Sequence, residues 1–512
     1  MGMFCKVQSL GLMGMNAFGV DVEIEMSKGI ERFDIVGLAD VAVKESRERI
    51  KAAFRSSNFR FPAANIVVNL APADVKKGGS SHDAAIAVAV LCAMSYIPEE
   101  STRDSVFIGE LSLGGDLRPV NGVLPMVILA KKQGVKRIYV PIDNAYEASV
   151  IDGVEIYGVS TLGELSDHLM GLKYIDRMPP YVPKVNDYAE TLDFCDVKGQ
   201  QSAKKALEVA ACGGHNVIMI GAPGSGKSML AKRLPSILPA MTFEEAIETT
   251  NVYSIAGQID KNSPLVTARP FRSPHHTVSA AGLTGGGSIP RPGEISLAHN
   301  GLLFLDELAE FARPTLEILR QPIEDKQVTI SRASGTITYP CDIMLVAAMN
   351  PCPCGYYGHP TKQCICSQKQ VAQYLSKISG PMLDRFDLHI EVAPVEYDSI
   401  SSTKKEESSS AVRERVQRAR EIQQNRFKGT GITCNARITS DILHDVCPVT
   451  DEANRQLKDV FERLGLSARA YDKILKVART VADMEAAEII DRKHIAQAVR
   501  YRTLDRKYWA NG

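Results

Sequence analysis

The sequence lacks any run of about 18 consecutive apolar residues, which is roughly the length that a helix needs to cross a bilayer. Its first ten residues, MGMFCKVQSL, also lack the long apolar core that follows a basic start in a secretory signal. Internal repeats and long low-complexity tracts are absent as well. We therefore expect a soluble cytoplasmic protein with no membrane partner.

Net charge is also missing, because Lys and Arg together number 60 and Asp and Glu together number 60. Overall charge therefore gives no argument for a nucleic-acid partner, which would need a local basic surface. Cysteine is present, but 11 cysteines in 512 residues fit reduced thiols or a metal site better than a disulfide framework.

The length and the 45% hydrophobic content predict two or three domains, because 512 residues exceed what one core can hold. Alternating segments such as 21–25 and helix-like stretches such as 84–94 predict an α+β domain over residues 1–171. The polar, proline-bearing segment 172–191 predicts a linker. A second domain is expected over residues 192–398, and a flexible segment followed by a small helical domain over residues 399–512.

The most specific motif is GAPGSGKS, which consists of Gly221, Ala222, Pro223, Gly224, Ser225, Gly226, Lys227 and Ser228. An apolar run at 217–220 precedes it and helix-forming residues follow, which is the context that a phosphate-binding loop requires. Backbone N–H groups would surround the phosphates, Lys227 would reach the β and γ oxygens, and Ser228 would ligate Mg²⁺. The positive N-terminus of the following helix would favour the same anion. We expect ATP and Mg²⁺ here, the alternative being a chance glycine-rich turn.

A second motif, GLLFLDE at residues 301–307, is an apolar strand that ends in two carboxylates. Asp306 would hold Mg²⁺ through its hydration shell, and Glu307 would orient and polarise the water that attacks the γ-phosphate. The alternative is a buried strand with a solvated acidic end, which is less expected about 80 residues after a phosphate loop.

Four of the cysteines are clustered, because Cys352 and Cys354 are followed after nine residues by Cys364 and Cys366. Four thiolates can close a tetrahedral structural Zn²⁺ site in the loop 352–366. The paired cysteines are closer in sequence than the usual two to four intervening residues, so four unliganded reduced thiols are the alternative.

Together with MNPCPCG at 349–355 and GPMLDRFDL at 380–388, these motifs resemble the magnesium-chelatase-like branch of the AAA+ ATPases. Two N-terminal stretches, FDIVGLADVAVKESRERI at 33–50 and VNLAPADVKKGGSSHD at 68–83, are similar to the YifB/ComM family. The resemblance therefore covers nearly the whole chain. It implies an α/β protein with an N-terminal α+β domain like that of Lon proteases, a central AAA+ P-loop domain and a C-terminal helical lid.

The resemblance also implies roles for three further residues. Asn350 would be the sensor 1 residue beside the attacking water, and Arg469 would be the sensor 2 arginine of the lid. Arg385 would be an arginine finger that enters the site of a neighbouring subunit, unless it only pairs with the aspartates beside it. A finger acting in trans requires an oligomer, and motors of this family form hexameric rings, so we expect a homo-hexamer stabilised by nucleotide.

Lon proteases use a serine nucleophile and a lysine base, and the resemblance permits a test of both positions. Ser81 falls near the nucleophile, but the lysine position falls on Leu124. A serine hydroxyl is a poor nucleophile without a base, and Lys131 and Lys132 lie seven or eight residues further on. The N-terminal domain is therefore expected to be noncatalytic.

Two insertions typical of this AAA+ branch are expected to contact a substrate inside the ring. One is the loop 282–292, which carries Arg291, and the other is the hairpin 327–339, which carries Arg332. Both arginines are candidates for DNA phosphate contacts, with solvated surface arginines as the alternative. The basic segment 412–428 is a further candidate, with a solvated helix face as the preferred alternative. His275 and His276 are adjacent, so we expect structural or interface roles rather than a metal pair.

These observations predict an ATP-hydrolysing ring motor. The YifB/ComM resemblance implies that it acts on DNA, as a helicase-like enzyme that promotes branch migration of recombination intermediates in transformation or recombination. Two alternatives remain open: an ATP-dependent protein remodeller or Lon-like protease, and a magnesium-chelatase-type motor subunit.

Overall fold

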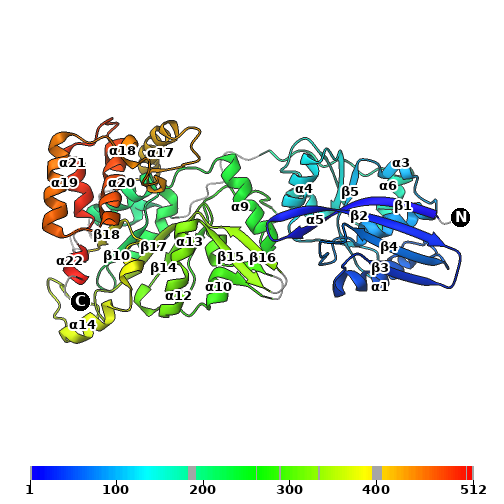
Figure 1. Ribbon diagram of the computed structural model, residues 1–512, viewed down its shortest axis with the longest axis horizontal. Helices are drawn as coiled ribbons and strands as arrows, with labels where there is room; N and C mark the ends of the chain where they lie inside the picture. Colours follow the sequence, from blue (N-terminus) through cyan, green and yellow to red (C-terminus); the bar gives the residue numbers. More distant parts are fainter. Residues whose placement is uncertain are drawn as a thin grey trace. The chain divides into compact units, whose positions relative to one another are not determined.

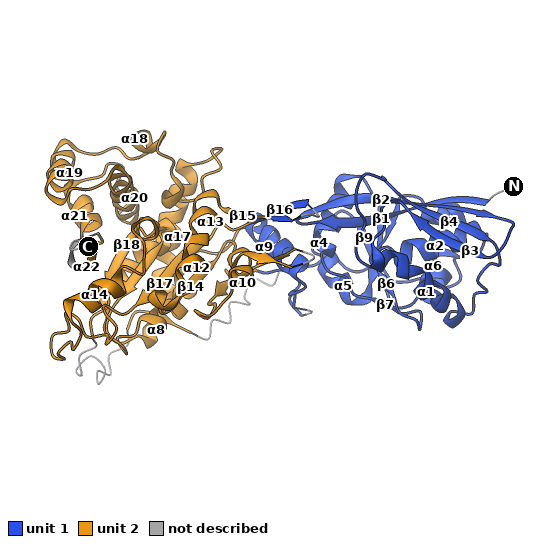
Figure 2. Ribbon diagram, turned by 60° about the horizontal axis from the view of Figure 1, so that its bottom comes forward, with its two compact units in different colours: residues 1–185, 243–266, 331–339 blue, residues 186–242, 267–330, 340–512 orange. Residues whose placement is uncertain are grey.

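The structure is a computed structural model of the chain, and it describes residues 3–182, 192–260, 262–287, 290–332, 335–394, 406–502 and 504–509. The chain divides into two compact units (Figure 2). Unit 1 comprises residues 1–185, 243–266 and 331–339, and unit 2 comprises residues 186–242, 267–330 and 340–512.

Unit 1 is built on a seven-stranded sheet with the order β3-β4-β2-β1-β5-β8-β9 (Figure 1). Its strands are β1 (Met3–Met13), β2 (Asn16–Ser27), β3 (Arg32–Val36), β4 (Asn65–Ala71), β5 (Ser105–Phe107), β8 (Arg137–Pro141) and β9 (Glu155–Val159). The short strands β6 (Glu110–Leu111) and β7 (Leu117–Arg118) form a separate antiparallel pair. The strands β1 and β2 form an antiparallel hairpin in which Met13 pairs with Asn16. In β4, alternate side chains are buried, which is the pattern of a sheet with one face toward a core.

The helices of the N-terminal part are α1 (Val41–Ser56), α2 (Asp83–Ala93), α3 (Glu99–Thr102), α4 (Val123–Lys132), α5 (Ile142–Ala148) and α6 (Leu162–Leu169). Every residue of α2 except Cys92 is buried, because this helix packs against β1 and β2 on one side and contacts α1 on another. A helix that is apolar all round is expected in such a central position. It anchors the main core of unit 1.

Two later segments of the chain also belong to unit 1. The helix α9 (Phe243–Ala256) packs on α4, and the Gly122 N–H donates a hydrogen bond to the Ser254 carbonyl at 3.0 Å. Ile337 comes so close to Gly14 that a Cβ at Gly14 would lie 2.4 Å from the Ile337 side chain. Residues 243–266 and 331–339, which come from the central part of the sequence, therefore belong to the same compact unit as the N-terminal region.

Unit 2 contains a five-stranded sheet with the order β11-β14-β17-β10-β18, and all of its pairings are parallel. Its strands are β11 (Phe271–Arg272), β14 (Leu302–Leu305), β17 (Met344–Met349), β10 (Val217–Ile220) and β18 (Leu388–Glu391). The central strands β10, β14 and β17 are buried throughout, as expected for a parallel sheet covered on both faces. A small antiparallel pair, β12 (Gly285–Gly286) with β13 (Arg291–Pro292), also belongs to unit 2. A further pair, β15 (Gln327–Arg332) with β16 (Gly335–Pro340), is divided between the units, because residues 331–339 belong to unit 1.

Helices connect these strands and then form the C-terminal part. Around the sheet lie η1 (Phe194–Asp196), α7 (Gln201–Gly213), α8 (Lys227–Arg233), η2 (Leu234–Ile237), α10 (Ala280–Thr284), α11 (Glu294–Leu297), η3 (Leu308–Glu310), α12 (Arg313–Ile318), α13 (Arg320–Asp325), α14 (Gln368–Leu375) and α15 (Gly380–Leu383). The C-terminal part has α17 (Ser409–Arg426), η4 (Asn435–Arg437), α18 (Leu443–Val446), α19 (Asp451–Leu464), α20 (Ala468–Met484), α21 (Arg492–Arg500) and α22 (Leu504–Trp509). Its buried residues share one core cluster with the sheet.

The expected fold class is confirmed: the protein is mixed α/β, with an α+β N-terminal region, a parallel sheet that carries the phosphate loop, and a helical C-terminal part. Residues 183–191 of the expected linker and 399–405 of the expected flexible segment lie outside the described residues. Residues 172–182 of the expected linker belong to unit 1, where the Met178 N–H donates to the Ile156 carbonyl at 2.8 Å. In the part of the chain that the structure describes, no helix is both long and apolar enough to span a membrane.

Candidate nucleotide site and cysteine loop

The phosphate-loop residues meet the two acidic residues and Asn350 at one edge of the unit 2 sheet. Strand β10 pairs with β17, with Ile220 opposite Met349, and β17 pairs with β14, with Leu305 opposite Ala347. Gly221, Asp306 and Asn350 directly follow these strands. Because the strands are parallel, their carboxyl ends lie at the same edge, which is where open α/β sheets bind ligands.

The phosphate loop uses its glycines for two purposes. Gly224 and Gly226 have φ angles of 77° and 94°, which favour glycine, and they turn the backbone into α8. Gly221 lies against the Val392 carbonyl, and a Cβ there would be 2.4 Å from that oxygen. Glycine is therefore favoured at positions 224 and 226 by the backbone conformation, and at position 221 by close packing.

Lys227 is buried and points its ammonium group into the loop. Its Nζ donates to the carbonyl oxygens of Gly221 at 2.7 Å and Ala222 at 2.9 Å, and to Asn350 Oδ1 at 3.2 Å. Burial lowers the pKa of Lys227 from its ordinary value of 10.5, while the charge of Asp306 opposes this change. The cation and the expected sensor 1 residue are thus already in contact.

The two acids occupy different environments. Asp306 is half-buried and accepts a hydrogen bond from Ser228 Oγ at 2.7 Å, so the two expected Mg²⁺-binding residues lie together. Glu307 is exposed, with φ at 52°, and its N–H donates to Asp306 Oδ1 at 3.0 Å. Asp306 thus contacts Ser228 whereas Glu307 is exposed, so the two carboxylates have different surroundings, in line with their two expected roles.

His276 is the residue at this site that the sequence did not identify. Its Nδ1 lies 3.4 Å from Glu307 Oε2, and its ring is tilted by 34° against that of His275, with the ring centroids 4.1 Å apart. The sequence marked the histidine pair only as structural or interface residues. The adjacency of two histidines does not indicate which carboxylate they face, because that contact joins residues 31 positions apart.

Arg385, the expected arginine finger, is buried within its own chain. Its Nη2 pairs with Glu324 Oε1 at 2.5 Å rather than with the aspartates beside it. Lys473 of α20 holds the backbone around it, because its Nζ donates to the carbonyl oxygens of Asp384 and Phe386, the latter at 3.0 Å. Arg469 is exposed in the first turn of the same helix, one turn before Lys473. The trans role of Arg385 and the sensor 2 role of Arg469 stay predictions.

Lys473 also forms an ion pair with Asp387, with Nζ at 3.0 Å from Oδ1. Burial alone would raise the pKa of Asp387, but the charges of Lys473 and His215 outweigh it and hold that pKa well below its ordinary value of 3.8. The lid helix α20 is therefore fixed by charge to the segment that carries Arg385.

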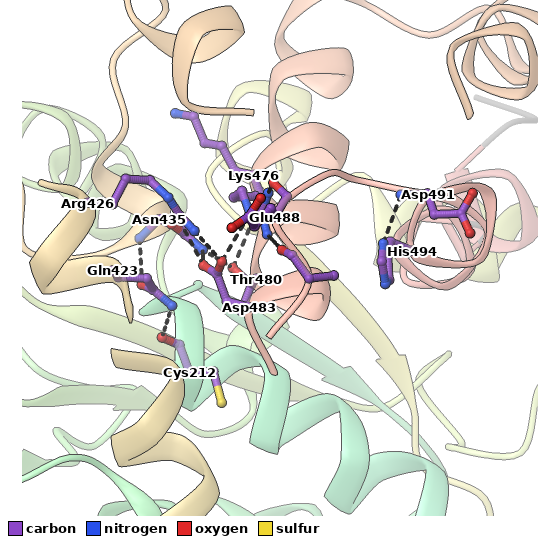
Figure 3. Close-up of polar contacts among 12 residues, drawn as sticks. Cys212, Gln423, Arg426, Asn435, Lys476, Thr480, Asp483, Glu488, Asp491 and His494 are labelled. Atoms are coloured by element: carbon purple, nitrogen blue, oxygen red, sulfur yellow. Dashed lines mark hydrogen bonds and ion pairs between the residues drawn. The ribbon is translucent and has the colours of Figure 1, made fainter. Parts of the chain in front are cut away.

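A second buried polar network fixes the lid to α7 (Figure 3). The Asp483 carboxylate accepts hydrogen bonds from Arg426, at 2.9 Å for Nη1, and from Asn435 at 2.7 Å. Gln423 donates to the Cys212 carbonyl of α7 at 3.0 Å. A buried network of this kind is costly to break, because any member left alone would be an unsatisfied polar group.

This network corrects the idea that the basic segment 412–428 offers a phosphate-binding surface. Four of its arginines contact the protein itself, namely Arg413 with Ser236, Arg415 with Glu208 and Glu407, Arg420 with Ala211, and Arg426 with Asp483. Only Arg418 and Lys428 of the six basic residues are exposed. Three of these arginines hold α17 against α7 and η2, while the residues at 410, 414, 418, 421 and 425 form an exposed helix face. This agrees with the preferred alternative, a solvated helix face.

The four clustered cysteines converge on one point. Their sulfur atoms all lie within 4.8 Å of one another, and Cys352 Sγ is 3.4 Å from Cys354 Sγ and 3.7 Å from Cys364 Sγ. Cys352 is buried and the other three are half-buried. None of them is in a disulfide. This donor set fits the tetrahedral zinc chemistry expected from the sequence.

The two DNA-contact candidates, Arg291 of β13 and Arg332 of β15, are both exposed. Their strands form the two small antiparallel pairs, so the expected hairpin at 327–339 is present. Residues 288–289 and 333–334, which belong to the two expected loops, lie outside the described residues. Exposure permits a phosphate contact at either arginine, and both assignments stay predictions.

In unit 1, the position expected to carry the lysine base of Lon proteases is apolar. Leu124 lies in α4 and is fully buried, while Lys131 and Lys132 are exposed in the last turn of that helix. Ser81 is 8% exposed, and burial lowers the pKa of the neighbouring His82 to about 4. His82 Nδ1 is engaged with Ser9 Oγ at 2.9 Å. His82, next to Ser81, is therefore neutral at neutral pH and bonded to Ser9, and the position expected to carry the lysine base is the buried Leu124. The buried Lys77, whose charge also lowers the pKa of His82, donates to the Pro72 carbonyl.

The chain matches three protein-family descriptions along its length. Residues 22–144 match subunit ChlI of Mg-chelatase, residues 193–400 match magnesium chelatase, subunit ChlI, and residues 406–502 match magnesium chelatase, subunit ChlI C-terminal. These three ranges include the Lon-like positions, the nucleotide site and the lid.

Similar proteins extend the match to the full length. The chain is 42% identical over 507 residues to competence protein ComM of Haemophilus influenzae, covering 98% of this chain and 97% of that protein. It is 41% identical over 507 residues to YifB of Escherichia coli, with the same two coverages. A partial similarity, 30% over 128 residues, joins 25% of the chain to 23% of Lon protease 2 of Bacillus subtilis.

Proposed function

This chain belongs to the ComM/YifB family of magnesium-chelatase-like AAA+ proteins, and from that premise we propose that it is an ATP-driven ring motor that acts on DNA. The family implies ATPase activity, with ATP and Mg²⁺ as cofactors. The proposed work is helicase-like branch migration of recombination intermediates. The observation that carries the DNA part is the full-length similarity to a competence protein.

The proposed chemistry assigns one role to each group of residues at the sheet edge. Gly221–Ser228 bind the phosphates, Ser228 and Asp306 bind Mg²⁺, and Glu307 orients and polarises the attacking water. Asn350 positions that water as sensor 1, and its existing contact with Lys227 supports this assignment. When bound, Mg²⁺ neutralises charge that develops on the transferred phosphoryl group.

The proposed assembly is a homo-hexamer in which each nucleotide site is completed by a neighbour. Arg385 would be supplied in trans, and Arg469 would contact nucleotide from the lid of the same chain. In the chain by itself Arg385 pairs with Glu324, so entering a neighbouring site requires that pair to be exchanged for the phosphate charge. Light scattering with ATP and Mg²⁺ is expected to report a hexamer, and a monomer under those conditions would contradict the proposal.

The proposed DNA contacts are Arg291 and Arg332, both exposed on small β-hairpins of the ATPase region. Phosphate contacts of this kind position a strand without reading its sequence. A structural Zn²⁺ at the cysteine cluster is the third proposed cofactor.

The deciding experiment compares ATPase rates with no polymer, single-stranded DNA, duplex, a four-way junction and unfolded protein. Stimulation by the junction, together with its ATP-dependent rearrangement in a gel assay, is the expected result. Stimulation by unfolded protein alone would instead favour the second candidate, a protein remodeller. That candidate draws on the partial Lon similarity, whereas buried Leu124 weighs against a protease.

A further inference from the structure

The four sulfur atoms of the cysteine loop have the separations of a metal tetrahedron. Zinc–sulfur bonds of about 2.3 Å place the sulfurs of a tetrahedral site about 3.8 Å apart. In the loop, three of the pairs measure 3.4, 3.5 and 3.7 Å, and all four sulfurs fall within 4.8 Å of one another. Disulfide sulfurs would be about 2.05 Å apart, so these sulfurs are too far apart to form disulfides and close enough to bind one metal ion.

The loop is shaped so that these thiols converge. Gly355 and Gly358 have φ angles of 83° and 73°, which turn the backbone directly after the first pair of cysteines. The Tyr357 N–H donates to Cys352 Sγ at 3.3 Å, a contact that fixes the position of this sulfur within the loop. Cys364 and Cys366 then return the chain to the same point.

We propose that Cys352, Cys354, Cys364 and Cys366 bind one Zn²⁺, and that this zinc-held loop fixes the sensor 1 residue and the phosphate loop of the nucleotide site in their working positions. Binding replaces four S–H bonds by four Zn–S bonds and releases the four thiol protons to solvent. Four thiolates complete the coordination of zinc, so the site is structural and has no position for a reacting water.

The connection to the nucleotide site is made by two contacts. The loop begins directly after Asn350, whose Oδ1 accepts from Lys227 Nζ at 3.2 Å. Gly355 packs so closely on Pro223 that a Cβ there would lie 2.4 Å from Pro223 Cδ. The N-terminal part of the loop therefore follows the sensor residue in sequence and packs against the phosphate loop. This part of the inference depends on the proposed ATPase function, whereas the metal site does not.

The metal site is tested by metal analysis of the full chain. About one zinc per chain is expected, falling at least tenfold in Cys366→Ser, because removing a ligand costs more than the 10- to 100-fold loss typical of outer-shell changes. Cys366→His should keep the metal, since three cysteines and one histidine also bind zinc. The matched control is Cys195→Ser, a half-buried thiol outside the cluster, which should keep the full amount.

Three results would overturn the metal site. They are less than one zinc per two chains in the unaltered protein, iron in place of zinc, or an unchanged zinc content in Cys366→Ser. Because Cys366→Ser could also unfold locally, cobalt replacement in the unaltered chain provides a second measurement. Absorption typical of tetrahedral thiolate coordination supports the site, and its absence argues against it.

The coupling to the nucleotide site is tested by Gly355→Ala, which alters no cysteine. The new Cβ must displace Pro223, so the affinity for a fluorescent ATP analogue should fall at least tenfold while zinc content stays at about one per chain, in line with the large rate and binding costs of small displacements. Gly429→Ala is the matched control, because Gly429 has the same φ of 83° but nothing within 4 Å of its Cβ position.

An unchanged nucleotide affinity in Gly355→Ala would refute the coupling while leaving the zinc site intact. Equal losses in Gly355→Ala and Gly429→Ala would refute it too, because backbone strain alone would then explain the effect. Neither metal content nor analogue binding requires hydrolysis or DNA. A failure of the motor proposal would therefore be seen separately from a failure of this one.

Discussion

The nucleotide site of unit 2 and the Lon-like serine region of unit 1 each lie in a loop between a strand and a helix, but only the first has complementary chemistry. In unit 2, Ser228 contacts Asp306 and Lys227 contacts Asn350. In unit 1, the position that would hold the base of Ser81 is the buried Leu124. Packing can preserve a fold after the chemistry at one position has changed, so function must be argued from sites and not from folds.

The largest effect is expected from removing the arginine finger. Arg385→Ala should lower ATP turnover about 10³-fold or more, the range found for fingers that neutralise charge on the phosphoryl group. Steady-state ATPase assays measure this loss. Mixing Arg385→Ala with Lys227→Ala subunits should restore part of the turnover, since each supplies what the other lacks.

The control for the finger is Arg418→Ala, which removes an exposed arginine of α17 and should leave turnover unchanged. A mixture that never regains activity would show that Arg385 acts only within its own chain, where it pairs with Glu324.

Two substitutions test directly whether the nucleotide site is catalytic and the Lon-like serine region is not. Glu307→Gln should slow hydrolysis by about 10²- to 10⁴-fold, because the amide cannot accept a proton from the attacking water. Ser81→Ala should change neither ATP turnover nor the stability of casein in the same reaction. Steady casein cleavage that disappears in Ser81→Ala would show that the serine region is catalytic after all.

A smaller loss of rate is expected from Lys473→Met. This change releases the carbonyls on both sides of Arg385 and should lower turnover by about 10- to 100-fold through a displaced finger. Mixing with Lys227→Ala should then restore activity, whereas mixing with Arg385→Ala should not. The opposite pattern would place the defect of Lys473→Met in its own nucleotide site. Lys473→Arg should retain most of the turnover.

The smallest expected effect is the pH dependence of stability, which has opposite signs in the two units. In unit 1, burial raises the pKa of Glu147, whose carboxylate accepts hydrogen bonds from Ser254 Oγ of α9 and from the Leu124 N–H. The folded state therefore holds its proton more tightly, and stability should fall as pH rises above the ordinary value of 4.5. In unit 2, the lowered pKa of Asp387 gives stability that is lost as pH falls below 3.8.

Hydrogen exchange measures the two trends separately. After correction for intrinsic rates, the amides of α4 and α9 should exchange faster as pH rises. Glu147→Gln should abolish this pH dependence in α4 and α9 without changing the pH dependence of exchange near Asp387. A slope that persists in Glu147→Gln would assign the pH dependence to another group.

Much of the nucleotide site could be predicted from the sequence, because a phosphate loop is local. Its eight residues are consecutive, and the strand before them and the helix after them are visible as patterns. The contact between His276 and Glu307 could not be predicted, because it depends on how β11 lies beside β14. The ion pairs that several arginines of the segment 412–428 form with Glu208 and Asp483 could not be predicted either, because these partners are distant in sequence.

The sequence by itself determined the family, the P-loop ATPase class and the residue types available for the chemistry, because these depend on short motifs and on similarity along the whole chain. The tertiary structure alone decided that four sulfurs meet at one point, that Gly355 presses on Pro223, and that Lys473 holds the backbone of Arg385. The four cysteines lie within 15 consecutive residues, whereas the other two contacts join segments separated by tens to more than a hundred residues. Only the packing of the sheet and lid brings such segments within bonding distance.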